Sequence, residues 1–247
     1  MTGPAGGPVT EERSGRPYRH FPVAVSAGAM ALAWARQEGG AHGATVLVDH
    51  EITALGRLGQ PWQTPPEATL ACAVILRPTL APDDADVAWL VGALGAAGGI
   101  ESATGTAVAT WWPDTVVDAG TGRRLGAVHA EIHMGPGRIR AAVMTVRLDL
   151  AGLGLNRSQS DDLLTAVVDA LDQACESLEE EGTAGAAAAY ERRCALIGKR
   201  LKVRLRPTGE TRGEASAVDS RGWLQLTSAT GMVERITVDM LRDLEVL

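Results

Sequence analysis

Apolar segments of two kinds alternate along most of this chain, and the alternation limits the folds open to it. Short runs rich in β-branched residues are typical of buried strands, and they cover residues 44–49, 69–77 and 139–150. Longer segments with apolar residues at helical spacing cover residues 27–37, 83–98, 160–181 and 186–196. Strands that alternate with helices predict a layered α/β fold.

A pair of strands is predicted in the middle of the chain, over residues 107–117 and 125–133. Pro113 interrupts the first strand, and Gly120 and Gly122 supply the turn between the two. Both strands are expected to join the sheet of the same α/β domain.

The pattern changes after Gly198. Residues 201–206 alternate apolar and basic side chains, which is typical of a half-exposed strand, and turn residues recur at short intervals from there to the end. Four or five short strands in about 50 residues predict a small closed barrel. We therefore expect a disordered tail over residues 1–20, an α/β domain over 21–195 and a small β domain over 196–247.

Composition excludes several classes of protein. The net charge of −7 gives no global positive field, so we expect no nucleic-acid partner. No apolar run reaches the roughly 18 residues of a membrane span, and the N-terminus lacks the apolar stretch of a signal peptide. The cysteines, Cys72, Cys175 and Cys194, are far apart and odd in number. A cytoplasmic protein without a membrane partner or a disulfide framework is expected, with Cys72 in the core.

Three segments resemble, in order, the motifs of the biotin–protein ligase family. Glu51–Trp62 reads EITALGRLGQPW where the family has Q-T-A-G-R-G-R-x-G-R-x-W, a glycine-rich loop. Trp111–Thr115 reads WWPDT for K-W-P-N-D, and Gly122–Glu131 reads GRRLGAVHAE for G-R-K-L-A-G-I-L-V-E. Residues 197–226 are similar to the family's C-terminal SH3-like module.

The resemblance covers about residues 22–247 and implies a class II-synthetase-like catalytic domain with a mixed sheet, followed by an SH3-like barrel. We expect no counterpart of the family's DNA-binding winged-helix extension in this chain, and therefore no repressor role. The implied activity joins biotin to ATP and passes the acyl group to a lysine of a biotin carboxyl carrier domain. ATP and Mg²⁺ would be required if the chain is active, and a homodimer is expected by analogy.

Two cations are implied for the adenylation step. Arg57 occupies an arginine position of the glycine-rich loop, and Arg124 occupies a lysine position, although Arg123 beside it is the alternative. Asp114 could help to hold Mg²⁺. The resemblance also implies ligand contacts at Ser26, Glu51, Gly56, Gly59, Trp62, Trp111, Trp112, Asp114, Gly126 and Ala127.

The departures from the family pattern fall where ligand contacts are implied. Trp111 replaces a lysine, Leu55 an arginine and Glu51 a glutamine, and Arg147 lies within the segment that replaces G-x-G-x-N. Losing one preorganised donor typically costs about 10²–10³ in rate. We therefore expect reduced or lost ligase activity, with Trp111 filling the biotin cavity. The alternatives are an inactive homologue that binds a small ligand or a carrier protein in a regulatory role, and a ligase for a different carboxylate.

His129, Glu131 and His133 alternate along one predicted strand and therefore share a face. The first and last of them would lie about 13 Å apart on a strand, so one ion could not easily bind all three. We expect a half-exposed polar face and no metal site.

Overall fold

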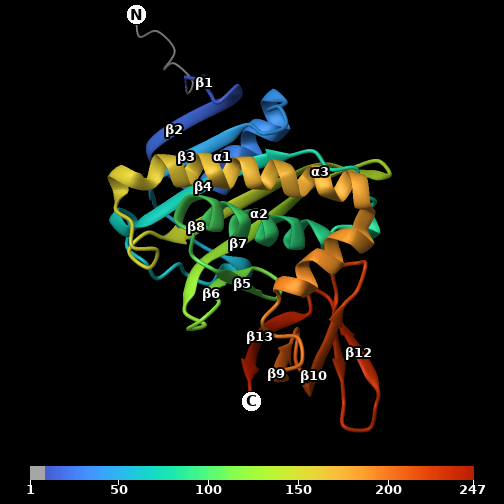
Figure 1. Cartoon of the computed structure of the whole chain (residues 1–247). Coiled ribbons are helices and arrows are strands. Elements are labelled where there is room, and N and C mark those ends of the chain that lie inside the picture. The colour runs from blue at the N-terminus through green and yellow to red at the C-terminus, as the bar shows by residue number, and fades with distance from the viewer. Residues whose placement is uncertain (1–8) are drawn as a thin grey trace, which may run out of the picture.

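Two sheets and three α-helices make up the computed structural model, which describes residues 9–247 (Figure 1). The strands of the first sheet are β1 (Glu11–Arg13), β2 (Arg16–Ala24), β3 (Thr45–Glu51), β4 (Thr69–Leu76), β5 (Val108–Trp111), β6 (Thr115–Asp118), β7 (Arg124–Gly135) and β8 (Arg138–Asp149). Those of the second are β9 (Arg200–Leu205), β10 (Glu210–Val218), β11 (Leu224–Thr227), β12 (Val233–Ile236) and β13 (Leu241–Val246). The helices are α1 (Ala27–Ala33), α2 (Val87–Thr104) and α3 (Ser160–Arg193).

Shorter helical segments connect these elements. A π-helical turn, Trp34–Glu38, continues α1, so the helix expected over residues 27–37 has two parts. The 3-10 turns lie at Arg57–Gly59, Pro66–Ala68, Pro82–Asp84 and Arg157–Gln159.

The first sheet has the strand order β1-β2-β3-β4-β8-β7-β6-β5. β2 and β3 pair in parallel, and the other neighbours pair antiparallel. The sheet is therefore mixed, as expected for the predicted α/β class. β5 and β6 form a hairpin on either side of the segment that contains Pro113, because proline cannot donate to a strand ladder.

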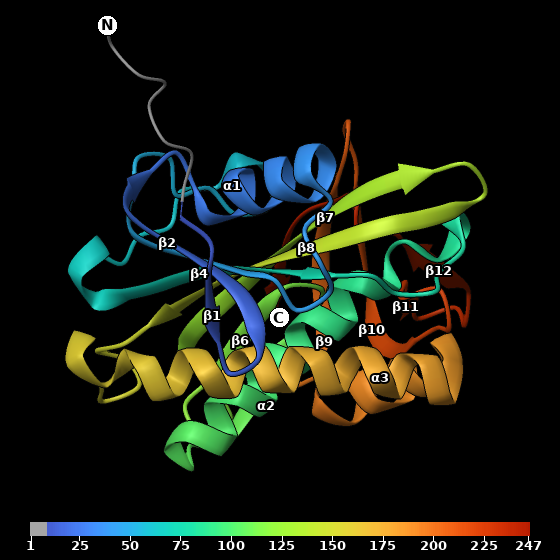
Figure 2. The same cartoon turned by 90° about the horizontal axis from the view of Figure 1, so that it is seen from above.

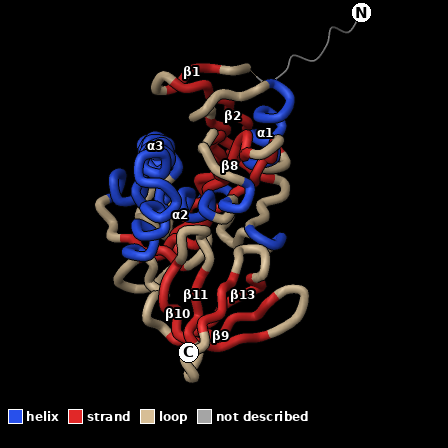
Figure 3. Tube along the Cα trace, turned by 90° about the vertical axis from the view of Figure 1, so that its right-hand side faces the viewer, coloured by secondary structure: helices blue, strands red, loops and turns tan. Residues whose placement is uncertain are grey.

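Alternate residues of the central strands pack on opposite faces of this sheet. In β4, Cys72 and Val74 belong to the large core beneath α2 and α3, whereas Ala73 and Ile75 belong to a smaller core with α1. Figure 3 shows the sheet between α1 on one side and α2 and α3 on the other, and Figure 2 shows the same layers from above. Burial on both faces explains why β4 is a continuous apolar run.

The helix α2 is apolar around its whole circumference and is long enough to cross a membrane by length and composition. In this structure most of it is buried between the sheet and α3. A Cβ atom added at Gly95 would lie 2.7 Å from the Cα atom of Leu171, and one at Gly99 would lie 2.5 Å from that of Val167. Glycine at these positions therefore lets the two helix backbones approach closely.

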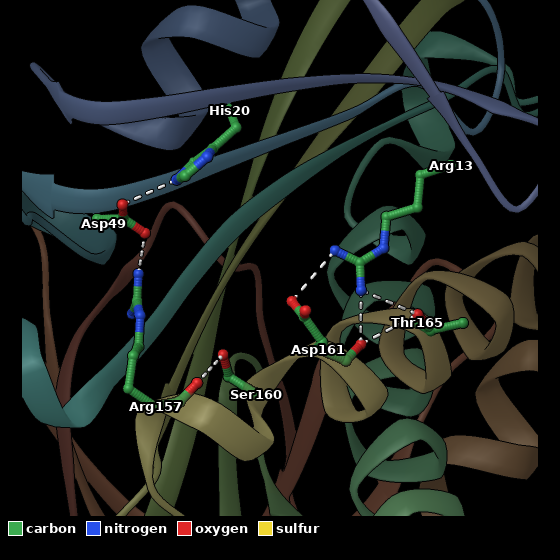
Figure 4. A network of polar contacts seen from close by, with 7 residues as sticks. All are labelled: Arg13, His20, Asp49, Arg157, Ser160, Asp161 and Thr165. Carbon is green, nitrogen blue, oxygen red and sulfur yellow. Dashed lines mark hydrogen bonds and ion pairs between the residues drawn. The ribbon is translucent and has the colours of Figure 1, made fainter.

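The prediction of a disordered tail over residues 1–20 is wrong for most of residues 9–20, because β1 and β2 cover residues 11–13 and 16–24. Residues 1–8 lie outside the described part of the chain. Figure 4 shows polar contacts near these strands: Arg13 donates to Asp161 Oδ1 of α3 at 3.2 Å, and His20 lies 2.8 Å from Asp49, which also pairs with Arg157. These charged partners are far apart in the sequence, so the sequence did not suggest that they pair. Their contacts hold β1 and β2 in place.

The two helices expected over residues 160–181 and 186–196 correspond to two helical segments on either side of Gly182, and the label α3 covers both. Gly182 has φ of 71°, a left-handed conformation that glycine adopts without a steric penalty. The helical conformation is therefore interrupted at the glycine, and the second segment ends at Arg193.

The second sheet is antiparallel throughout, with the order β12-β11-β10-β9-β13, and is compatible with the predicted SH3-like barrel. The Trp112 indole donates to the Gly222 carbonyl at 2.9 Å, and the Val238 amide donates to Asp86 at 3.1 Å. One apolar core contains Leu171 of α3 together with Leu201 of β9. The division into domains at residue 195 therefore stays a prediction.

Candidate functional site

Two cavities lie next to each other on the α1 side of the first sheet. The first, about 410 Å³, is called the arginine cavity and is lined by Arg57, Trp62, Trp111, Asp114, Arg124 and Arg242, among others. The second, about 270 Å³, is called the threonine cavity and is lined by Ser26, Gly28, Leu55, Gly59, Glu131 and Thr145, among others. Gly56, His129 and Arg147 line both, so they lie where the cavities meet.

A buried ion pair lies at this meeting point. Arg147 Nε lies 2.5 Å from Glu51 Oε2 and Arg147 Nη2 lies 2.9 Å from Glu51 Oε1, with side chains 5% and 3% exposed. Arg147 Nη1 also donates to the Leu55 carbonyl at 2.9 Å, and the Ala27 amide donates to Glu51 Oε1 at 2.8 Å. All three guanidinium nitrogens thus have partners within the protein.

The sheet register explains how this pair forms. Arg147 of β8 lies opposite Ala71 of β4 on one side and Ala127 of β7 on the other, so small residues flank the guanidinium. Glu51 is the last residue of β3, the strand beyond β4. A long side chain from β8 can therefore reach the end of β3 across Ala71. Glu51 was expected to contact ligand, but it lines neither the arginine cavity nor the threonine cavity.

Arg57 of the glycine-rich loop is also engaged within the protein. Its Nε lies 3.1 Å from Asp114 Oδ2, and its Nη1 donates to the Leu241 carbonyl of β13 at 2.5 Å. The other carboxylate oxygen of Asp114 accepts from the Thr115 hydroxyl at 3.0 Å. Both charged groups are about 15% exposed, so each largely neutralises the other within the arginine cavity.

Arg124 is less engaged within the protein than Arg57 is. Its guanidinium lies 4.8 Å from the centre of the Trp62 ring, a cation–π distance, and it has no ion pair or hydrogen bond to any of residues 9–247. Arg123 lies outside the cavity and donates to the Gly152 carbonyl. Of the two arginines that the sequence left as alternatives, Arg124 is the one at the cavity.

The two neighbouring tryptophans have different surroundings. Trp111 is half-buried and lines the arginine cavity, and it does not line the threonine cavity, which contains Ser26. That Trp111 fills a biotin cavity stays a prediction; Trp111 ends β5, at the edge of the sheet far from β3. Trp112 is 1% exposed and belongs mainly to the core.

Of the remaining residues predicted to contact ligand, all but Gly126 line one of the two cavities. Gly59 and Ser26 line the threonine cavity, and Ala127 lines the arginine cavity. The Ser26 hydroxyl accepts from the Ala29 amide at 3.1 Å, as the N-cap of α1. Gly126 lines neither cavity; a Cβ atom there would lie 2.5 Å from Leu148.

Sequence reasoning did not assign Thr145, His129 or Glu131 to a ligand site. Thr145 of β8 lies directly opposite His129 of β7, and both line the threonine cavity with Glu131. The Thr145 hydroxyl and His129 Nδ1 are buried without a hydrogen-bond partner among the described residues. The alternation of polar side chains along residues 129–133 was the available signal, but it did not reveal the neighbouring threonine.

No group of three or more metal-ligating side chains lies within residues 9–247. Mg²⁺ commonly uses one or two carboxylates together with substrate phosphates. Asp114 and Asp243 line the arginine cavity, but Asp114 is already paired with Arg57. The donor set therefore fits an ion brought in with a nucleotide better than an ion held by protein alone.

These features define a class: a mixed α/β fold with an appended β module and two adjoining cavities on one face of the first sheet. Biotin protein ligases have this fold. The ligase from Aquifex aeolicus in complex with biotin and ATP superposes with a TM-score of 0.73 at 14% identity, covering 93% of this chain and 99% of that one. A biotin acetyl coenzyme A carboxylase synthetase from Helicobacter pylori, with bound biotinylated ATP, gives 0.60 at 13% identity over 88% and 98%.

A biotin protein ligase-like protein of unknown function from a Silicibacter species is also similar, with a TM-score of 0.70 at 14% identity over 94% of this chain and 98% of that one. No protein-family model matches the sequence, and no curated protein matches it. At these identities the likeness establishes the fold, and the activity of this chain has to be argued from its own residues.

Proposed function

We propose that this protein uses a biotin-ligase fold to bind a nucleotide in the arginine cavity and a small carboxylate ligand beside it, with biotin ligation impaired. The observation that carries the impairment is the buried Glu51–Arg147 ion pair at the meeting point of the cavities. The resemblance implies glutamine and a small residue in these two regions.

Adenylation requires two anions, a carboxylate and a phosphate, to meet in the presence of cations that are free to stabilise the added charge. Arg147 is close to this point, but Glu51 neutralises it and every nitrogen of its guanidinium is already bonded. Its side chain also takes up volume that a glycine would leave open. The ion pair therefore disfavours both the approach and the electrostatic stabilisation of the reactants.

Nucleotide binding is supported by the residues of the arginine cavity. Arg124 has no protein anion as a partner among residues 9–247, and its guanidinium lies against the Trp62 ring. Arginine is well suited to phosphate because its planar donors can bind two oxygens at once. Mg²⁺ bound with the nucleotide would neutralise phosphate charge, and Asp114 or Asp243 could contact it.

Three further properties follow from the resemblance and belong to the same proposal. A biotin carboxyl carrier domain would be the protein partner, either as an acceptor or as a regulated target. A homodimer and a cytoplasmic location are expected by analogy with the biotin protein ligase family.

Nucleotide binding can be tested with a pair of neighbouring substitutions. We expect Arg124→Gln to weaken ATP binding by about tenfold or more, because one charge-assisted contact is lost. Arg123→Gln is the matched control, since Arg123 lies outside the cavity and bonds to Gly152. Isothermal titration calorimetry with Mg·ATP measures both. Equal affinities for the two variants would contradict the proposed nucleotide site.

Impaired ligation is tested on the unaltered protein by biotin-dependent exchange of pyrophosphate into ATP. We expect no exchange above the background without biotin. Exchange at rates of an ordinary biotin protein ligase would overturn the impaired assignment and favour an active enzyme.

A further inference from the structure

The threonine cavity has polar groups that no part of the protein satisfies. The Thr145 side chain lines this cavity, the residue is 2% exposed, and its hydroxyl has no hydrogen-bond partner within residues 9–247. A buried hydroxyl without a partner has lost its hydration without compensation. A ligand that supplies the missing partner would recover this free energy.

Glu131 adds a negative charge to the same place. A Cβ atom at Gly28 would lie 2.3 Å from the Thr145 hydroxyl oxygen and 2.7 Å from Glu131 Oε2, so the two oxygens are close neighbours. Glu131 forms no ion pair or hydrogen bond with any of the described residues, 9–247. Gly28 thus leaves open a small space bordered by two hydrogen-bond acceptors.

The other charged groups of this cavity do not balance Glu131. Arg147 is neutralised by Glu51, and burial lowers the pKa of His129, so that its ring is neutral at pH 7. The carboxylate of Glu131 is therefore the uncompensated charge of the threonine cavity. A ligand carrying an ammonium group fits this environment, whereas an apolar chain or a second anion does not.

The adjoining cavity has the opposite character. Its lining includes Arg57, Arg124, Arg147 and Arg242 against Asp114 and Asp243. Thr145 and Arg147 are two residues apart on β8, which corresponds to about 6–7 Å along a strand. A short chain with an ammonium group at one end and a carboxylate at the other would span the two environments.

We propose that the carboxylate ligand of this protein is an amino carboxylate whose ammonium group binds Glu131 and Thr145 and whose carboxylate faces the arginine cavity. This inference rests on the proposed function and specifies its ligand class. Glu131 supplies charge, and Thr145 supplies a hydroxyl acceptor. The carboxylate is then directed toward the bound nucleotide.

The test compares two probes of the same length, ε-aminocaproate and caproate, which differ in the terminal ammonium group. Calorimetry with the full chain should give at least about tenfold tighter binding of ε-aminocaproate than of caproate. Biotin serves as a third probe. Equal or tighter binding of caproate or biotin would overturn the proposal, and so would no binding of ε-aminocaproate at millimolar concentration.

Two variants identify the groups responsible. Glu131→Gln should abolish the preference for ε-aminocaproate over caproate, whereas Glu176→Gln, an exposed glutamate of α3, should leave it unchanged. Thr145→Val should weaken ε-aminocaproate binding severalfold and yet raise the melting temperature, because it removes a buried hydroxyl without a partner. Weaker binding together with a lower melting temperature would indicate general damage and contradict the role of the hydroxyl.

The two proposals can fail separately. Mg·ATP binding that is retained while ε-aminocaproate shows no preference would overturn the ligand class and leave the nucleotide site intact. A clear preference for ε-aminocaproate without Mg·ATP binding would overturn the nucleotide site and leave the ligand class intact.

Discussion

Glu51 and Arg147 show how two substitutions can look like independent losses in the sequence and form one feature in the structure. Each would be strongly unfavourable if buried alone, because an isolated charge in the interior loses its hydration. Together they satisfy each other through two contacts, and each also makes one hydrogen bond with the backbone. The pair is therefore a structural unit, although a buried pair need not add net stability.

Removing one partner of this pair should be costly. We expect Glu51→Gln to lower the free energy of unfolding by about 3–5 kcal/mol, because Arg147 is left buried without a counter-charge. The double variant Glu51→Gln/Arg147→Met should be less destabilised than Glu51→Gln alone. Chemical denaturation of Glu51→Gln, of Arg147→Met and of the double variant gives the coupling free energy between the two side chains.

An exposed ion pair supplies the control for this measurement. Arg212 and Glu210 interact with side chains 60% and 39% exposed, so Glu210→Gln should leave the free energy of unfolding nearly unchanged. Additive losses in the variants of Glu51 and Arg147 would show that the two side chains are not coupled.

At the level of elements, two consecutive glycines of α2 lie at different distances from α3. Gly99 faces Val167, whose backbone nitrogen would lie 2.8 Å from an added Cβ atom. Gly98 faces Ala170, whose Cβ atom would lie at an ordinary distance of 3.5 Å. Two consecutive glycines of the same helix therefore have opposite tolerance for a side chain.

Gly99→Ala and Gly98→Ala form a matched pair for this idea. We expect Gly99→Ala to destabilise the protein by about 1–3 kcal/mol, because the helix backbones must move apart. Gly98→Ala should be neutral or stabilising by up to about 1 kcal/mol, since alanine favours the helix over glycine. Thermal or urea unfolding measures both. A loss in Gly98→Ala as large as in Gly99→Ala would exclude the close backbone contact as the cause.

For the whole molecule, the second sheet is bonded to the first part of the chain at several points. Trp112 bonds to Gly222, Arg57 bonds to Leu241, and the Val218 amide donates to Glu191 at 3.0 Å. These bonds accompany a continuous apolar core. The two parts are therefore expected to unfold together.

Hydrogen exchange followed by mass spectrometry can test this cooperativity. Peptides from α2 and from β9–β11 should exchange with the same free energy of opening at low denaturant, within about 1 kcal/mol, because neither part keeps its core without the other. Exchange of β9–β11 through an opening several kcal/mol lower would instead show that the second sheet unfolds as an independent domain.

The sequence by itself determined the class of fold, most strands and helices, and the loop that carries Gly56 and Arg57, because these depend on periodicity and on short local motifs. It did not determine the pairing of Glu51 with Arg147 or of Arg57 with Asp114, or the meeting of Glu131 with Thr145. Those contacts depend on strand order and register, which bring side chains from distant segments to one end of the sheet. Local preferences act over a few residues, whereas the charge balance of the two cavities is set by tertiary structure.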